Sequence, residues 1–220
     1  IPLFGINFGK VGYLASVEQH DWQSALESLF AGDYRIEEGA TLAATVQRGD
    51  KTFDHGWAIN DVVIRGGLRM VEVEAYVDGR YVNTYPGDGM IVATTQGSTA
   101  YCMAAGGPIM MSGVRGFAMV PISAHSPIRT PIVLAEDTTT ELLMTNDHEA
   151  QLVLDGRAKM RLGKGDIVTV RKGEHQFRLI ALSSTSFFEA VRTKFNYLIR
   201  PDAVPTRAPS LTPRNGCTVS

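Results

Sequence analysis

The sequence has few cysteines, no long apolar run and almost no excess charge. Only Cys102 and Cys217 occur, which is too few for a disulfide framework and indicates a reducing compartment. No stretch reaches the ~18 apolar residues of a membrane span, and no charged and then apolar leader opens the chain. A formal net charge of -2 and a pI near 6.2 provide no general attraction to nucleic acid or to an anionic membrane. We therefore expect a cytoplasmic protein that holds any anionic ligand by local contacts.

What the sequence does contain is enough apolar material for a large core. The 220 residues are 44% hydrophobic and 20% charged, which predicts one large or two small soluble domains. The chain begins with Ile1, and "IPLFGINFG" resembles an apolar strand in the middle of a fold. We expect the natural protein to begin further upstream.

Most of the chain has the pattern of short strands. In "MVEVEAYVDGRYVNTY", apolar and polar residues alternate on either side of Asp78-Gly79, which predicts a hairpin. Asp155-Gly156 predicts a second tight turn. One helix is expected at 21–32, with Asp21 as its cap and Gly32 at its end. Further strands are expected at 41–48, 57–64, 89–94, 117–122, 139–145, 149–154, 167–171 and 177–182. The fold class is therefore mainly β, with stacked or prism-like sheets.

The end of the chain differs from this pattern. Ser186 and Glu189 have the spacing of a capping box, and apolar residues follow at helical intervals, so a helix in need of a partner surface is expected there. Residues 201–220 combine prolines with small polar residues and are expected to be a disordered tail.

Several common motifs fail on inspection. "GINFGKVG" has too short a spacing for a Walker loop, and Val11 stands where Ser or Thr would hold magnesium. The five histidines are scattered, without the spacing of a metal site. Ser98 lacks the Gly-x-Ser-x-Gly context of a serine hydrolase.

Two polar interruptions of apolar strands are the remaining candidates. Asn60-Asp61 breaks "WAI..VVI", where an unpaired buried carboxylate is expensive, so the pair is either a turn bonded to its own backbone or a ribose-binding pair. In "GDGMIVATTQGSTAY", Asp88 is either a turn residue or a ligand contact. Thr99, Ala100 and Tyr101 at a helix start would offer free N–H groups and a hydroxyl to a base or phosphate.

Five segments together resemble the bacterial NAD kinases. They are "GINFGKVGYL", "AINDVVI", "YPGDGMIVATTQGSTAYCMAAGGPI", "VPISAHSPIRTPIVL" and "SSTSFFEAVRTKF", in the family's order and at matching separations. The resemblance covers about residues 3 to 198. It implies an enzyme that transfers the terminal phosphoryl group of ATP, brought with Mg²⁺, to the 2′-hydroxyl of the adenosine ribose of NAD.

The resemblance also implies roles for single residues in binding NAD. Asn60 and Asp61 would hold the acceptor ribose, with Asp61 where the family usually has Glu. Asp88 would contact the nicotinamide-side nucleoside, and Thr99 and Ala100 would contact adenine. The remaining positions implied to lie at the ligand are Tyr101, Ala104, Ser123, His125 and Asp155. Three departures bear on this pocket: Pro86 replaces a basic or polar residue, Gln96 a small residue, and Ala104 a serine that bonds the dinucleotide.

Family architecture further implies how the chain divides. Residues 1–33 would be part of an α/β nucleotide domain, 34–183 the β-rich NAD-binding domain, and 184–200 a helix returning to the α/β domain, before the tail. A homodimer or homotetramer is expected, with ATP or polyphosphate as the phosphoryl donor and no nucleic acid or membrane as partner.

One family motif is absent from the 220 residues. Gly-Gly-Asp-Gly-Thr, whose backbone cradles the ATP phosphates and whose Asp activates the acceptor hydroxyl, occurs nowhere in the sequence, so no catalytic base is assigned to this chain. We expect the chain alone to be inactive. The alternatives are a non-catalytic dinucleotide-binding module, or a lipid kinase of the related superfamily. An in-frame Gly-Gly-Asp-Gly-Thr upstream would favour the kinase, and a start codon near Ile1 the module.

Overall fold

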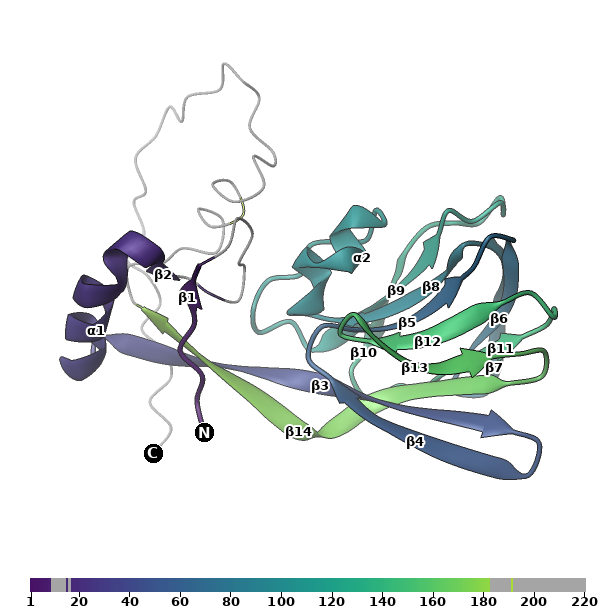
Figure 1. The fold of residues 1–220 in the computed structure, drawn as a ribbon, viewed down its shortest axis with the longest axis horizontal. Helices are drawn as coiled ribbons and strands as arrows, with labels where there is room; N and C mark the ends of the chain where they lie inside the picture. The colour runs from purple at the N-terminus through teal and green to yellow at the C-terminus, as the bar shows by residue number, and fades with distance from the viewer. Residues whose placement is uncertain (9–14, 16, 183–190, 192–220) are drawn as a thin grey trace, which may run out of the picture. The chain divides into compact units, whose positions relative to one another are not determined.

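The computed structural model describes residues 1–8, 15, 17–182 and 191 (Figure 1). The chain divides into two compact units, one formed by Ile1–Glu37 with Arg178–Ser220 and the other by Glu38–Phe177. Each unit is described by itself below. The terminal helix and tail predicted from the sequence lie outside the described residues, apart from Val191.

The larger unit is built on two six-stranded sheets. The first sheet has the order β10 (Ile132–Ala135), β9 (Gly116–Ile122), β8 (Gly89–Thr94), β5 (Asp61–Gly66), β12 (Ala150–Leu154) and β13 (Arg157–Leu162). The second has the order β4 (Lys51–Ala58), β3 (Tyr34–Arg48), β14 (Ile167–Leu182), β11 (Thr140–Met144), β6 (Val71–Val77) and β7 (Arg80–Gly87). The mainly β fold with stacked sheets is confirmed.

The principal core joins residues of the two sheets. Strands β6, β11 and β12 bury every second residue, as expected for strands with one face in the core. The fully buried Leu42 and Leu142 from the second sheet belong to the same cluster as Ile64, Met90 and Leu152 from the first. Burial on this scale, at about 25 cal/mol per Å² of apolar surface, is the main force that holds the sheets together.

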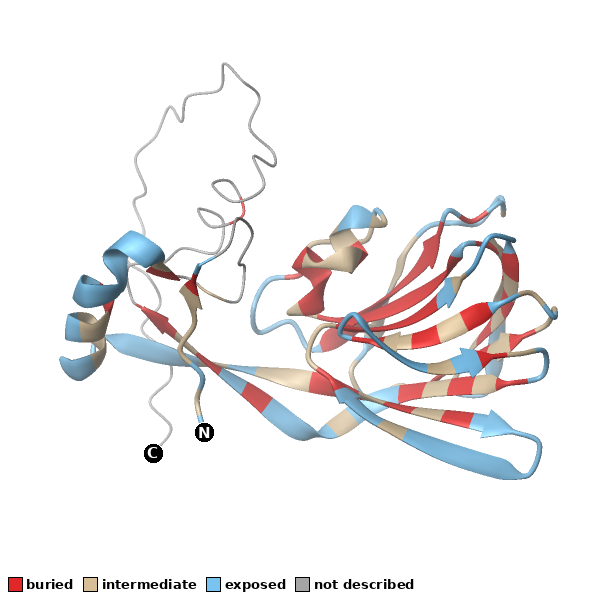
Figure 2. Cartoon of the chain, viewed as in Figure 1, coloured by how far each residue is buried: buried red, intermediate tan, exposed pale blue. Residues whose placement is uncertain are grey.

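The central strands of the first sheet are buried on both faces (Figure 2). Their second face is covered by a segment that contains a 3₁₀ helix at Gly97–Thr99 and the short helix α2 (Tyr101–Ala104). Cys102 and Met110 of this segment pack with Val63, Ile91 and Val120 of the sheet. This cover explains why β5, β8 and β9 are continuous apolar runs.

The smaller unit contains a short parallel pair, β1 (Ile6–Asn7) with β2 (Val17–Glu18), followed by a 3₁₀ helix at Gln19–Asp21 and by α1 (Trp22–Phe30). The helix predicted at 21–32 is confirmed, and Gly32 follows its end with φ +77°. Asp21 makes no side-chain capping bond, so that part of the prediction is wrong. Instead, the Ser24 hydroxyl donates to the Asp21 carbonyl at 3.0 Å.

Both tight turns are confirmed. Asp78 and Gly79 have φ of 48° and 71°, and Asp155 and Gly156 have φ of 46° and 75°, the left-handed geometry of two-residue hairpins.

The strand expected at 57–64 is wrong. The chain leaves the second sheet at Ala58 and enters the first at Asp61, so one apolar run belongs to β4 and β5. The segments 167–171 and 177–182 are parts of the single strand β14, whereas β10 and β13 were not predicted.

Candidate functional site

The chain crosses from β4 to β5 at residues 59–60, and hydrogen bonds to the end of β8 hold this crossing in place. The Thr94 hydroxyl donates to the Ile59 carbonyl at 2.6 Å, and the Thr94 amide donates to the Asn60 carbonyl at 2.9 Å. The same hydroxyl accepts from the Gly97 amide at 2.9 Å. A Cβ at Gly97 would lie 1.9 Å from the Asn60 carbonyl oxygen, so only glycine fits. The need for glycine at this position therefore comes from the protein backbone.

The carboxylate of Asp155 accepts hydrogen bonds from backbone amides at the same crossing. One oxygen accepts from the Ile59 amide at 2.8 Å, and the other accepts from Asn60 and Asp61 at 2.8 and 3.1 Å. Three successive N–H groups directed at one anion form a backbone nest. The Asp155 amide in turn donates to the Asp61 carbonyl at 3.1 Å.

Asp61 is the buried acidic group of this site. Its side chain begins β5, and the residue is only 5% exposed. Burial, with a smaller contribution from the negative charge of Asp155, raises the pKa of Asp61 to about 6. The Asp61 carboxyl group therefore changes between its neutral and charged forms close to neutral pH.

A cavity of about 660 Å³ opens beside this pair. Asn60, Asp61, Ala100, Tyr101 and Asp155 line it, and the wall is completed by Val63, Arg65, Gln151, Val153, Gly156 and Ala158. Carboxylate and amide oxygens together with a phenol ring suit a group that has both hydroxyls and a flat apolar face.

A second cavity of about 560 Å³ adjoins the first, since Arg65 and Tyr101 line both. Asp88, Ala104 and Ser123 also line it. The Asp88 backbone is held in place, because its amide donates to Ile122 and its carbonyl accepts from Gly66. Asp88 thus lies at the bend between β7 and β8 and lines the cavity, so its contact with a ligand stays a prediction.

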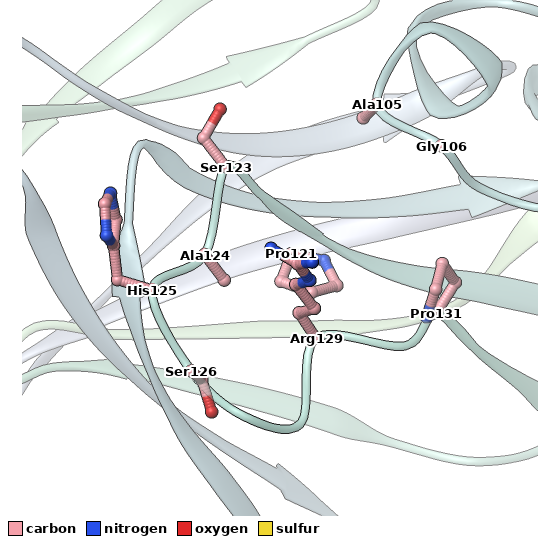
Figure 3. Close-up of a pocket in the computed structure, with 9 residues that line it drawn as sticks. All are labelled: Ala105, Gly106, Pro121, Ser123, Ala124, His125, Ser126, Arg129 and Pro131. Atoms are coloured by element: carbon pink, nitrogen blue, oxygen red, sulfur yellow. The ribbon is translucent and has the colours of Figure 1, made fainter.

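A third cavity of about 460 Å³ continues from the second, with which it shares Ala105 and Ser123 (Figure 3). His125, Ser126 and Arg129 line it, and no carboxylate does. The loop that carries these side chains is anchored where the His125 amide donates to the Pro86 carbonyl at 2.8 Å.

The three cavities lie next to one another through shared lining residues, all within Glu38–Phe177, and together they are called the groove. It begins at an acidic end with Asp61 and Asp155 and finishes at a basic end with Arg129. A ligand with hydroxyl groups beside Asp61 and negative charge beside Arg65, which lines the first two cavities, matches these charges.

Nine of the ten residues implied by the family resemblance line this groove: Asn60, Asp61, Asp88, Ala100, Tyr101, Ala104, Ser123, His125 and Asp155. Thr99 lies behind its wall, since it is 5% exposed and its hydroxyl donates to the Gln96 carbonyl at 3.1 Å. The Ala100 amide donates to the Gly97 carbonyl, so the expectation that it is free is wrong.

Sequence reasoning missed four polar residues of the groove, Arg65, Ser126, Arg129 and Gln151. Arg65 directly follows the apolar run of β5, and this position was the only available signal. The ion pairs of the described residues include neither arginine.

The described part of the chain has neither a metal-binding cluster nor a membrane-spanning helix. No three His, Cys, Asp or Glu side chains come together there as a metal site. None of the described helices is long and apolar enough to cross a membrane.

Fold and groove together define a β-sandwich domain that carries a groove lined by polar residues. The profile of the ATP-NAD kinase C-terminal domain matches residues 59–182, which contain all ten of the predicted site residues. The chain is 53% identical over 207 residues to an NAD kinase of Thermomicrobium roseum and 40% identical over 200 residues to one of Geobacter metallireducens. These matches cover 94% and 90% of this chain and 72% and 71% of the relatives.

Solved structures agree on the fold. Yeast NADH kinase complexed with NADH superposes with a TM-score of 0.82 at 18% identity, over 94% of this chain and 61% of that chain. An NAD kinase from Archaeoglobus fulgidus in complex with ATP superposes with a TM-score of 0.73 at 26% identity, over 87% of this chain and 74% of that one. The chain belongs to the NAD kinase family, whose members are ATP-dependent phosphotransferases.

Proposed function

We propose that the groove binds the acceptor NAD, and that this chain presents the 2′-hydroxyl of the adenosine ribose to a phosphoryl donor. The observation that carries the proposal is the first cavity, where Asn60 and Asp61 face the same space as Ala100 and Tyr101. The amide and carboxylate suit ribose hydroxyls, and the Tyr101 ring suits the face of the adenine base.

The rest of the dinucleotide follows the groove. Arg65, which lines the first two cavities, neutralises the pyrophosphate between the two nucleosides. The nicotinamide-side nucleoside then lies by Asp88, in the second cavity, toward Ser123 and His125. Ala104, at the wall of the second cavity, leaves space where the family's serine would bond the ligand.

Phosphoryl transfer depends mainly on positioning and on charge stabilisation around the donor phosphates. The described residues supply the positioning of the acceptor. In the family, the Gly-Gly-Asp-Gly-Thr motif supplies the general base and the cradle for the donor ATP, which brings Mg²⁺. The 220 residues do not contain this motif. Polyphosphate is the other donor that this arrangement would admit.

The test is a pair of assays with ATP, Mg²⁺ and NAD. The 220-residue chain alone is expected to make no NADP, because it lacks the cradle and the base. A protein that joins these residues to a Gly-Gly-Asp-Gly-Thr segment is expected to turn over. Clear turnover by the chain alone would overturn this division of roles, and absence of NAD binding to either protein would overturn the proposed function.

A further inference from the structure

Asp155 holds the backbone of the acceptor site, although family resemblance suggested that it touches the ligand. We propose that Asp155 is a positioning residue: its carboxylate fixes residues 59–61 so that Asn60 and Asp61 face the acceptor. This inference rests on the proposed function, since the acceptor is the NAD ribose of the first cavity.

The geometry leaves the carboxylate little capacity for a ligand. Both of its oxygens are engaged, with three N–H donors at 2.8, 2.8 and 3.1 Å. Hydrogen bonds to a charged acceptor are about twice as strong as neutral ones, so this contact outweighs any other at the crossing. The carboxylate thus shapes the cavity through Ile59, Asn60 and Asp61.

The turn that carries Asp155 is itself rigid. Strand β12 ends at Leu154, which is paired with Val62 of β5. The following Asp155-Gly156 turn places the carboxylate directly against the start of β5, where the Asp155 amide also donates to the Asp61 carbonyl. Each of the two segments therefore fixes the other, and the crossing has one arrangement.

The charge of Asp155 also acts on Asp61. Asp155 raises the pKa of Asp61 beyond the effect of burial. The other titratable or charged groups at this point are Cys102 on α2, which senses the charge of Asp61, and Arg65 and Tyr101, which line the same cavity. If the negative charge is removed from the nest, the pKa of Asp61 falls.

The principal test is chemical rescue. In Asp155→Ala the nest is vacated, and NAD affinity measured by calorimetry is expected to fall roughly 10- to 100-fold. Sodium formate, whose carboxylate fits the empty nest, is expected to restore much of the loss, whereas sodium chloride at equal ionic strength is not. Asp155→Asn keeps an acceptor oxygen but loses the charge, so it is expected to bind with intermediate affinity and to be insensitive to formate.

A matched control is available in the other sheet. Asp78 occupies the same kind of Asp-Gly turn, and its carboxylate accepts from the Thr139 amide at 2.9 Å, but it does not line the groove. Asp78→Ala is expected to lower the melting temperature without any effect on NAD affinity or any response to formate.

The pH dependence of NAD affinity adds a readout that a purely structural role would not move. In Asp155→Ala the acid limb is expected to shift to lower pH, and formate is expected to shift it back. If wild type binds NAD and folded Asp155→Ala binds it equally well, or if its loss does not respond to formate, the positioning role is wrong. If wild type itself does not bind NAD, the proposed function fails.

Discussion

Asp61 illustrates the conflict between stability and binding at a single residue. It is almost fully buried, and its charged form is disfavoured by burial and by Asp155. A ribose hydroxyl that donates to the carboxylate would supply the stabilisation that the free protein lacks. The same burial, with the charge of Asp61, raises the pKa of the neighbouring Cys102 thiol to about 11, so this thiol is unreactive near neutral pH.

Replacement of Asp61 by Asn is expected to stabilise the fold and to lower the affinity for NAD. The raised pKa means that the protonated form is favoured on folding, and that this stabilisation is present below pH 3.8 and lost as the pH rises through about 6. Asp61→Asn therefore gains stability progressively as the pH rises from 3.8, and above about pH 6 the gain reaches at most about 3 kcal/mol, at 1.36 kcal/mol per pH unit. Thermal unfolding at pH 4 and pH 7.5 measures the difference.

The control for this variant is Asp50→Asn, in the exposed turn between β3 and β4. It is expected to change neither the melting temperature nor NAD affinity. The acidic-site account would be contradicted by an Asp61→Asn protein that gains nothing at pH 7.5, or that binds NAD as tightly as wild type.

At the residue scale, polar residues that interrupt apolar runs of the sequence located the site. Asn60-Asp61 stood out because polar residues broke an apolar run, and the structure brings both to one cavity. What the sequence did not reveal was the partner of that interruption. Asp155 lies 95 positions from Asn60, and no local pattern relates the two. Likewise, the close approach of Gly97 to the Asn60 carbonyl depends on sheet pairing, which spacing alone does not show.

At the scale of elements, strand β5 connects the parts of the groove. Its first residue, Asp61, lies in the first cavity, and Arg65 lines both the first and the second. Residues i and i+4 of a strand share a face, so both side chains belong on the groove side of the sheet. The length of β5 therefore sets the separation between a ribose contact and a phosphate contact.

Arg65→Ala is expected to lower the affinity for NAD about tenfold, which corresponds to about 1.4 kcal/mol, because it removes a cation from beside the pyrophosphate. Adenosine has no phosphate, so its affinity is expected to be unchanged. Calorimetric titrations with the two ligands at low and high salt measure the contrast. Arg80→Ala, at the exposed first residue of β7, is the control. Equal losses for adenosine and NAD would contradict this position for the pyrophosphate.

The strands β10 and β13 were missed for different reasons. Strand β10 consists of four apolar residues, which are too few to show a period. Strand β13 does alternate polar and apolar residues in RAKMRL, so its pattern predicts a strand that the sequence analysis did not include. Both are edge strands, which need less apolar surface. The strand expected at 57–64 was wrong because an apolar run does not show when the chain changes sheets at Ile59 and Asn60.

At the scale of the whole molecule, the number of short strands was sufficient to predict stacked sheets. Which part of the protein binds the acceptor and which part binds the donor was not predictable from periodicity. That prediction rested on the order of the family segments. The structure adds that three of those segments, AINDVVI, YPGDGMIVATTQGSTAYCMAAGGPI and VPISAHSPIRTPIVL, line the groove, although they are distant in sequence. The predicted domain boundaries, the oligomeric state and the cytoplasmic location remain predictions.

The central claim is that the first cavity holds the adenosine of NAD, and Ala100→Leu tests it most directly. Ala100 is half-buried and lines the cavity, so a larger side chain there fills ligand space without overpacking the core. NAD titrations by calorimetry are paired with thermal unfolding of wild type, Ala100→Leu and the exposed control Ala135→Leu on β10. The account predicts lost NAD binding at a nearly unchanged melting temperature for Ala100→Leu alone; retained NAD affinity in a folded Ala100→Leu protein would contradict it.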